Sequence, residues 1–162
     1  MELRDLAIKK LEERGVLLQD IADITFNLQD KYQDNLTCNE CLDMVNQVLD
    51  KREVIHTILT GIALDEVAEK GLIDKEVCDL IKADNGLYGM DEILALGITN
   101  LFGSIALTNF GYTDKNKPGI IGKVDKEGKE GIKCNTFLDD IIGAIAASAA
   151  ARLAHTRGTS NI

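Results

Sequence analysis

The chain has 162 residues, of which 45% are hydrophobic, and it contains no tryptophan. Its 27 Asp and Glu residues outnumber its 18 Lys and Arg residues, which gives a formal net charge of −9. A surface of this charge repels nucleic-acid phosphates and anionic lipid head groups, so we expect no nucleic-acid partner and peripheral membrane contact at most. The length suits one domain, and we expect a single helical domain over residues 1–162.

Short amphipathic helices are predicted along the first half of the chain, because apolar residues recur there at spacings of three and four. These apolar runs cover residues 3–11, 17–28, 42–49, 54–67 and 77–81. We expect Gly15 and Gly71 to end the first and fourth helices, Thr37 or Asn39 to cap the third, and Asp74 to begin the fifth. No segment alternates as a β-strand does, so the predicted fold class is all-α.

The N-terminus is a charged amphipathic run and not a signal peptide, which indicates a cytoplasmic protein with reduced thiols. Cys38 and Cys41 form a CxxC pair, but no second pair or nearby histidine completes a zinc site. We therefore interpret these two cysteines as ordinary buried or half-buried thiols.

Residues 93–113 form a stretch of 21 residues without a charge, about the length of a membrane span. Polar residues and three glycines dilute its hydrophobicity, and no second stretch of this kind accompanies it. We therefore predict a buried helix over residues 93–109 near the centre of the domain.

The next segment, residues 114–133, contains six lysines, four acidic residues, four glycines and the only proline of the chain, Pro118. It shows no helical or strand period, so we predict a long, charged, exposed loop before the last helix. The last helix is expected from about Phe137 to Leu153, with a frayed tail from about residue 156.

Two adjacent pairs of acids stand where the chain becomes most apolar. Asp91 and Glu92 open the uncharged helix, and Asp139 and Asp140 open the alanine-rich last helix. Capping explains one acid of each pair, since Thr136 to Asp139 matches a capping box. Adjacent side chains point about 100° apart on a helix, so the second acid of each pair faces elsewhere. If the two helix starts meet, the spare carboxylates would form an oxygen-rich site suited to Mg²⁺.

Lysines follow the uncharged helix directly. Lys115 and Lys117, with Pro118 fixing the backbone beside them, could reach a phosphate held over a metal ion, although such a run is often only a solvated loop. Another acidic group, Asp65, Glu66 and Glu69, lies on one predicted helix and is similar to the acidic helices of all-α nucleotide pyrophosphohydrolases. We interpret that group first as a solvated helix face.

Three ordered motifs resemble the phosphatidylglycerophosphatase A family: GMDEI at residues 89–93, DKNKPG at 114–119 and FLDDIIGA at 137–144. The first half of the chain is similar to the non-membrane branch of that family, including ERGV at residues 13–16 and KREV at 51–54. Membrane-bound members have several spanning helices. They also carry a glycine- and proline-rich motif in the first half, and in the corresponding place this chain has LTGI, without a proline, at residues 59–62. These departures leave the acidic motifs intact. They concern whether the substrate of this chain is a lipid.

The resemblance implies Mg²⁺-dependent hydrolysis of a phosphate monoester, either phosphatidylglycerophosphate or a more soluble ester. It makes Asp91, Glu92, Asp139 and Asp140 the expected metal and general-base carboxylates, with Asp140 and Glu92 as the catalytic candidates. Asp114 would support the metal, and Lys115 and Lys117 would bind the substrate phosphate.

Two other functions remain open from the sequence. The first is a non-catalytic helical oligomer or ligand-binding protein on the same scaffold, since Gly143, Ala144, Ala147 and Ala151 permit close helix packing within or between subunits. The second is nucleotide pyrophosphohydrolysis through Asp65, Glu66 and Glu69.

Overall fold

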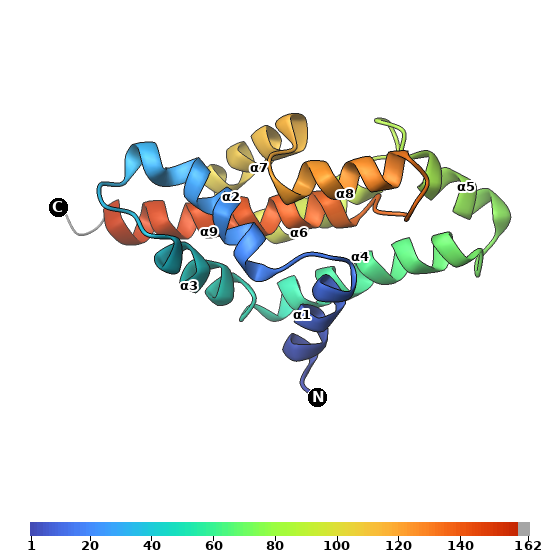
Figure 1. Cartoon of the computed structure of the whole chain (residues 1–162), viewed down its shortest axis with the longest axis horizontal. Helices are drawn as coiled ribbons and strands as arrows, with labels where there is room; N and C mark the ends of the chain where they lie inside the picture. The colour runs from blue at the N-terminus through green and yellow to red at the C-terminus, as the bar shows by residue number, and fades with distance from the viewer. Residues whose placement is uncertain (159–162) are drawn as a thin grey trace.

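The computed structural model describes residues 1–158, and all regular structure within them is helical, which confirms the predicted all-α fold. The chain folds around one long helix near its C-terminus (Figure 1). In chain order the helices are α1 (Leu3–Glu13), α2 (Leu18–Gln29), the 3₁₀ helix η1 (Asp30–Tyr32), α3 (Cys38–Val48), α4 (Arg52–Lys70), α5 (Lys75–Ala83), α6 (Met90–Thr99), α7 (Ser104–Asn116), α8 (Ile120–Lys129) and α9 (Leu138–Gly158).

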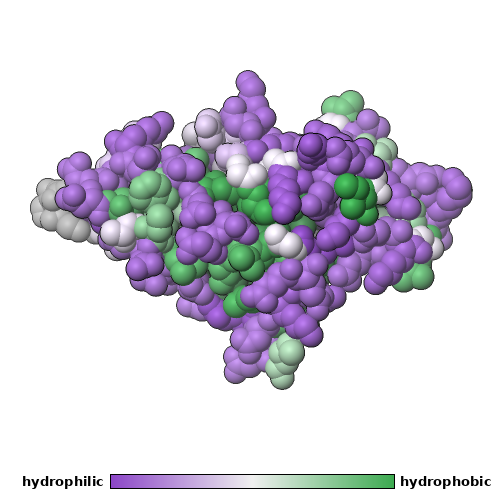
Figure 2. Space-filling model, in the orientation of Figure 1, coloured by the Kyte–Doolittle hydropathy of each residue, from purple (hydrophilic) through white to green (hydrophobic). Residues whose placement is uncertain are grey.

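Helix α9 is the centre of the fold. Every residue from Leu138 to Ala151 is buried, and α2, α3, α4, α6, α7 and α8 all pack against this helix. An alanine-rich helix that is apolar on all sides has no preferred solvent face, so it is stable only inside a ring of other helices. Polar side chains cover most of the face seen in Figure 2, with apolar atoms gathered near its middle.

The prediction of a central helix over residues 93–109 is wrong. The uncharged stretch is divided into α6 and α7, because Gly103 adopts φ 95° and ψ −166°, a conformation that only glycine reaches without strain. Ile98 and Phe110 face inward and are buried, whereas Ile93 is 56% exposed and Leu107 is 53% exposed. The two helices therefore form an outer layer on α9. Within residues 1–158 no helix combines the length and the apolar content needed to cross a membrane.

The predicted long charged loop is also mostly helical. Helix α7 continues to Asn116, and α8 places Ile121 and Val124 against the core while its lysines face outward. Only residues 130–137 remain as a connection to α9. The frayed tail is not found at residue 156, since α9 continues to Gly158 and Arg157 donates hydrogen bonds to Glu40 and to the Asp34 carbonyl. Residues 159–162 of that predicted tail lie outside the described part of the chain.

The predicted helix ends of the first half are confirmed. Gly15 and Gly71 have φ angles of 82° and 64°, as expected for residues that terminate helices. Thr37 caps α3 in a capping box, in which its hydroxyl accepts from the Glu40 amide and the Glu40 carboxylate accepts from the Thr37 amide.

Helices α7 and α9 approach each other closely at Gly143. A Cβ atom added there would lie 2.8 Å from Oγ1 of Thr113, whose side chain is fully buried. The small residues Gly143, Ala144, Ala147 and Ala151 thus serve packing within the chain.

We expect Gly143→Ala to lower the free energy of unfolding by roughly 1–3 kcal/mol, the usual cost of overfilling a packed core. The control is Gly97→Ala in α6, where an added Cβ would meet no atom within 4 Å. That change should be neutral or stabilise the protein by up to about 1 kcal/mol, because alanine favours a helix interior over glycine. Urea unfolding of the two variants tests the packing, and equal effects would contradict it.

Candidate functional site

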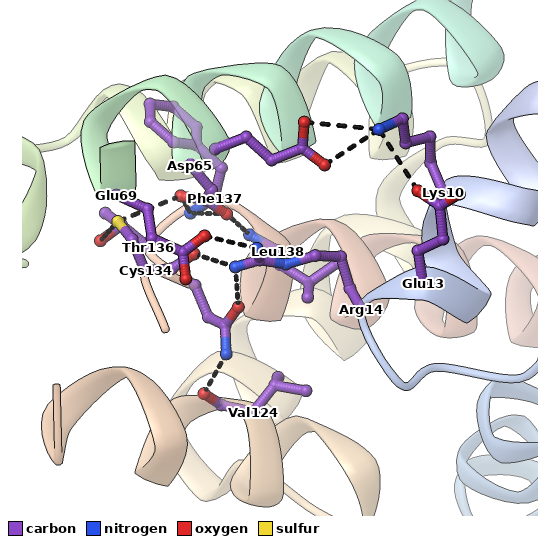
Figure 3. A network of polar contacts seen from close by, with 12 residues as sticks. Lys10, Glu13, Arg14, Asp65, Glu69, Val124, Cys134, Thr136, Phe137 and Leu138 are labelled. Atoms are coloured by element: carbon purple, nitrogen blue, oxygen red, sulfur yellow. Dashed lines mark hydrogen bonds and ion pairs between the residues drawn. The ribbon is translucent and has the colours of Figure 1, made fainter. Parts of the chain in front are cut away.

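The carboxylate of Asp65, in the middle of α4, binds the beginning of α9. This side chain is fully buried and accepts hydrogen bonds from the backbone amides of Phe137, at 3.0 and 3.2 Å, and Leu138, at 3.0 Å (Figure 3). The capping box predicted between Thr136 and Asp139 is not formed, because the Thr136 hydroxyl donates to the Ile81 carbonyl instead. A remote carboxylate therefore caps α9 and leaves Asp139 and Asp140 free for other contacts.

Arg14 joins the same network from the end of α1. The side chain is 7% exposed, and its guanidinium contacts Glu69 of α4 at 2.8 Å and the side-chain oxygen of Asn135 at 2.7 Å. It also donates to the Cys134 carbonyl (Figure 3). Asn135 in turn donates to the Val124 carbonyl of α8. The segment before α9 is thus fixed by three other helices.

The acidic group of α4 has structural partners throughout. Asp65 caps α9, Glu69 pairs with Arg14, and Glu66 pairs with Lys10 at 3.1 Å. Burial raises the pKa of Asp65 to about 8, although the two amide donors favour the charged form. These contacts explain the three acids as parts of the packing between α1, α4 and α9.

The two predicted acid pairs come together around the start of α9. Asp140 lies within hydrogen-bonding reach of Asp114, from α7, and Asp91, from α6. Burial, Asp139 and these two carboxyls raise the pKa of Asp140 to about 11. Asp139 and Asp140 are each only 3% exposed and Asp91 only 7% exposed. At neutral pH such a cluster must share protons or bind a cation, because several buried negative charges cannot stand side by side.

Lys117 neutralises part of this carboxylate cluster, by which we mean Asp91, Asp114, Asp139 and Asp140. Its ammonium group lies 3.0 Å from Asp139 and 3.3 Å from Asp114. Burial lowers the pKa of Lys117, but Asp139, Asp140 and Asp114 outweigh it and the net pKa is raised.

The backbone at Lys117 is unusual. It is left-handed, with φ of 46°, and the close approach of α8 requires glycine at position 122, where a Cβ would lie 2.6 Å from the Lys117 carbonyl oxygen. Strained lysine backbone beside a charge cluster is typical of functional sites.

Two oxygen atoms of the cluster have no hydrogen-bond partner, namely Oδ1 of Asp139 and Oδ1 of Asp140. Carboxylate oxygens are the ligands that Mg²⁺ prefers, so the donor chemistry fits this ion. Within residues 1–158, no three acidic, histidine or cysteine side chains already stand as a ready ligand set. Binding an ion would therefore require the carboxyl groups to give up their shared protons and reorient.

The remaining predicted residues lie at the edge of the cluster. Glu92 is partly exposed, and burial, Asp91 and Asp114 raise its pKa. Lys115 is exposed in the last turn of α7 and forms no ion pair with the described residues. The structure thus places Glu92 with the acids but gives Lys115 no partner.

Sequence reasoning missed two further acids, Asp84 and Asp125. Burial raises the pKa of Asp139 to about 7; Lys117 opposes this shift, and Asp84 and Asp125 add to it. Asp84 ends α5 in a left-handed conformation, and burial, Asp91 and Asp125 raise its pKa to about 6. Asp125 lies on α8, where a loop was predicted. A helical reading of Ile120, Ile121 and Val124 would have placed Asp125 beside the core.

Removing the cap of α9 should destabilise the whole fold. We expect Asp65→Ala to cost roughly 2–4 kcal/mol, because two buried amides lose their carboxyl acceptor. The control Thr37→Ala removes an exposed cap from α3 and should cost only about 1 kcal/mol. Equal losses in chemical denaturation would contradict the special position of Asp65.

The cluster also predicts how stability depends on pH. The pKa values of Asp139 and Asp140 in the fold lie above the ordinary value of about 3.9, so the folded chain retains protons that the unfolded chain releases. Stability is then greatest in acid and falls as pH rises through this range, by up to about 1.4 kcal/mol per pH unit for each retained proton.

Without divalent cations we therefore expect the melting temperature to fall between about pH 5 and about pH 8. Asp140→Asn should weaken that dependence, whereas Asp43→Asn, a change of an exposed acid of α3, should leave it unchanged. An identical pH profile for the Asp140 variant would show that the cluster is not protonated as described.

Similar proteins share this architecture along nearly the whole chain. The low temperature requirement C protein from Listeria monocytogenes has a crystal structure with a TM-score of 0.93 and 51% identity, over 98% of each chain. A protein of unknown function from Bacillus stearothermophilus gives a TM-score of 0.91 and 54% identity, over 96% of each chain. The uncharacterized protein YpjQ of Bacillus subtilis (strain 168) is 51% identical over 155 residues, which span 96% of this chain and 86% of YpjQ.

The family model of phosphatidylglycerophosphatase A matches residues 17–155. This range includes α2 to α8, the carboxylate cluster with Lys117, and nearly all of α9. The match and the three ordered acidic motifs agree, and the chain belongs to the phosphatidylglycerophosphatase A family.

Proposed function

We propose that this protein is a phosphatase that hydrolyses phosphate monoesters with the help of Mg²⁺ held by the carboxylate cluster. The observation that carries the proposal is the position of Asp140, within hydrogen-bonding reach of Asp91 and Asp114 and with an oxygen atom that lacks a partner. Carboxyl groups from α6, α7 and α9 meet there at high local charge density, an arrangement that binding a divalent cation would stabilise.

Asp91, Asp114, Asp139 and Asp140 are the residues that would hold the ion, with Glu92 beside them. When bound, Mg²⁺ supplies positive charge to the phosphoryl oxygens and lowers the pKa of a bound water. Asp65 and Arg14 act at a distance from the chemistry, because they fix the first turn of α9 and thereby the direction of Asp139 and Asp140.

Lys117 is the residue best placed to bind the substrate phosphate. It already contacts Asp139 and Asp114, and it can exchange part of those contacts for phosphate oxygens. Lys115 is exposed in the last turn of α7, two residues before Lys117, and it remains a predicted second phosphate contact.

Glu92 is the preferred general base. It is partly exposed, and its raised pKa brings it closer to the operating pH than an ordinary glutamate. In the reaction a water oxygen forms a bond to phosphorus, Glu92 takes the proton of that water, and the bond from phosphorus to the ester oxygen breaks. The leaving alkoxide takes a proton from solvent. Asp140, the other predicted catalytic carboxylate, acts here as one of the residues that would hold the ion.

Phosphatidylglycerophosphate, the substrate in the family's name, is one candidate monoester, and a more soluble ester is the other. The net charge of −9 disfavours close contact with an anionic bilayer, so membrane contact is expected to be peripheral. Cytoplasmic location and a possible homo-oligomer stay predictions of the sequence. Gly143 and Ala147 pack inside the chain, so these small residues no longer support a contact between subunits.

The decisive experiment compares Asp140→Asn with the wild-type protein in a phosphate-release assay over a panel of monoesters, with and without Mg²⁺. We expect the variant to lose at least about 100-fold in rate, the usual size of a missing acid–base or charge-stabilising group. The variant should fold, because an amide replaces a buried acid of similar shape.

The matched control is Asp43→Asn, which removes one exposed negative charge from α3 and should retain full activity. A second measurement does not depend on turnover: Mg²⁺ should raise the melting temperature of the wild-type protein and not that of Asp140→Asn. Full Mg²⁺-dependent activity in the Asp140 variant would reject this site.

A further inference from the structure

A cavity of about 350 Å³ lies toward the C-terminal end of α9. Its wall is formed by the end of α2, the 3₁₀ helix η1, the first two turns of α7 and the last part of α9. Figure 1 shows the end of α9 and the turn after α2 at the same end of the molecule. Ala154 of this wall follows Asp140 by about 21 Å along α9. The cavity is therefore distinct from the carboxylate cluster and shares no lining residue with it.

The wall of this cavity is uncharged. None of the described residues that line it is acidic or basic, although 28% of the chain is charged. Side-chain amides and hydroxyls stand there beside the ring of Tyr32 and the aliphatic side chain of Ile105. Such a wall has no charge to balance that of an ionic ligand. The cavity therefore suits a neutral ligand that has both polar and apolar surface.

Two amides of the wall contain atoms without a hydrogen-bond partner. Gln29 is only 4% exposed, and its Oε1 accepts no hydrogen bond from any of residues 1–158. The buried Nδ2 of Asn109, on α7, finds no acceptor within the same range. A buried polar atom without a partner destabilises a fold, so it needs an explanation wherever it occurs. Two such atoms in the wall of one cavity indicate groups that a ligand completes.

The unpaired atoms define what this ligand must present. Oε1 of Gln29 needs a donor and Nδ2 of Asn109 needs an acceptor, so the ligand carries both kinds of group. Side-chain amides pair with the edges of nucleobases through such complementary contacts. A pyrimidine such as uracil holds an N–H directly beside a C=O in one plane. A flexible polyol also has donors and acceptors, but it loses conformational freedom on binding and has no flat face.

Tyr32 supplies an aromatic surface for the face of a planar ligand. Its side chain is exposed, with the ammonium group of Lys31 4.9 Å from the ring centroid on one side. Aromatic side chains stack on every nucleobase, and this contact needs no charge on the ligand. The two amide atoms are shielded from water, so a ligand reaches them only when a side chain of the wall turns. Tyr32 has that freedom because it is exposed.

We propose that this cavity binds a neutral planar ligand of the nucleobase or nucleoside class. The ligand donates an N–H to Oε1 of Gln29, accepts from Nδ2 of Asn109 through a carbonyl, and stacks on Tyr32. This inference is independent of the proposed phosphatase function, because neither amide belongs to the carboxylate cluster.

The test uses uridine as the probe and 3-methyluridine as its matched control. The added methyl group replaces the ring N–H and leaves both carbonyl groups and the ribose in place. We expect uridine to shift the side-chain amide NMR signals of Gln29 and Asn109. We expect 3-methyluridine to bind at least about tenfold more weakly, because Oε1 of Gln29 stays unpaired. Ribose alone should shift neither signal.

Gln29→Met tests the same contact from the side of the protein, since it keeps the length of the side chain and removes the amide. We expect Kd for uridine to rise at least about tenfold. Without ligand the melting temperature should rise by about 2–4 °C, because an unpaired buried oxygen is gone. The control Gln19→Met changes an exposed glutamine of the same helix and should leave both values near those of the wild-type protein.

Several results would overturn the inference. Millimolar uridine might leave both amide signals in place, or uridine and 3-methyluridine might bind equally, and either result would show that no N–H is recognised. Binding of ribose alone would assign the cavity to a polyol. A lower melting temperature and an unchanged Kd for Gln29→Met would show that Oε1 has a partner in the fold. Uridine should still bind to Asp140→Asn, which separates this site from the phosphatase.

Discussion

The arrangement of this molecule depends on a single buried carboxylate at the beginning of its central helix. Helix α9 is enclosed by other helices, so its first amides cannot be satisfied by water and must find partners in the protein. Asp65 supplies those partners from the middle of α4. Because a remote residue caps the helix, the two aspartates of its first turn are released from that task, and the acids of α6 and α7 can gather around them.

Concentrated negative charge inside a helical bundle is costly, and the fold contains visible compensation. Lys117 is held among the acids by a left-handed turn that lysine does not favour, and Asp84 adopts a similar conformation at the other edge. Gly122 keeps α8 close to that turn. A protein selected for stability alone would replace such a cluster with apolar residues. Its presence in a chain with an otherwise aliphatic core indicates a site maintained for binding or chemistry.

Local patterns in the sequence were sufficient for much of the architecture. The glycines at positions 15 and 71 end helices as predicted, and Thr37, one of the two caps predicted for α3, caps that helix through a neighbour within a few residues. The acid pairs were also visible, because carboxylates directly before the most apolar segments need an explanation beyond solvation. The acid pairs stand at the starts of two helices. The sequence indicated those starts but could not show that they lie side by side in the fold.

The failures concern contacts between distant parts of the chain. Asp65 lies 72 residues before Phe137, so nothing near Thr136 reveals that the cap of α9 comes from elsewhere. Helix α8 was hidden because its lysines and glycines mask the spacing of Ile120, Ile121 and Val124. The uncharged stretch has the composition of an interior helix, but Gly103 divides it and α9, with its small side chains, takes the inner position.

The order of the helices has a consequence for how the protein is made. Helix α9 follows in the sequence every helix that packs around it, so a ribosome releases the surrounding layer before the element on which that layer closes. Until α9 emerges, the inner faces of α2, α3, α6 and α7 have no common surface to bury, and the nascent chain exposes much of its future interior. This is a chain that must complete its folding late, largely after synthesis of its central helix, and protection by chaperones would matter most in that interval.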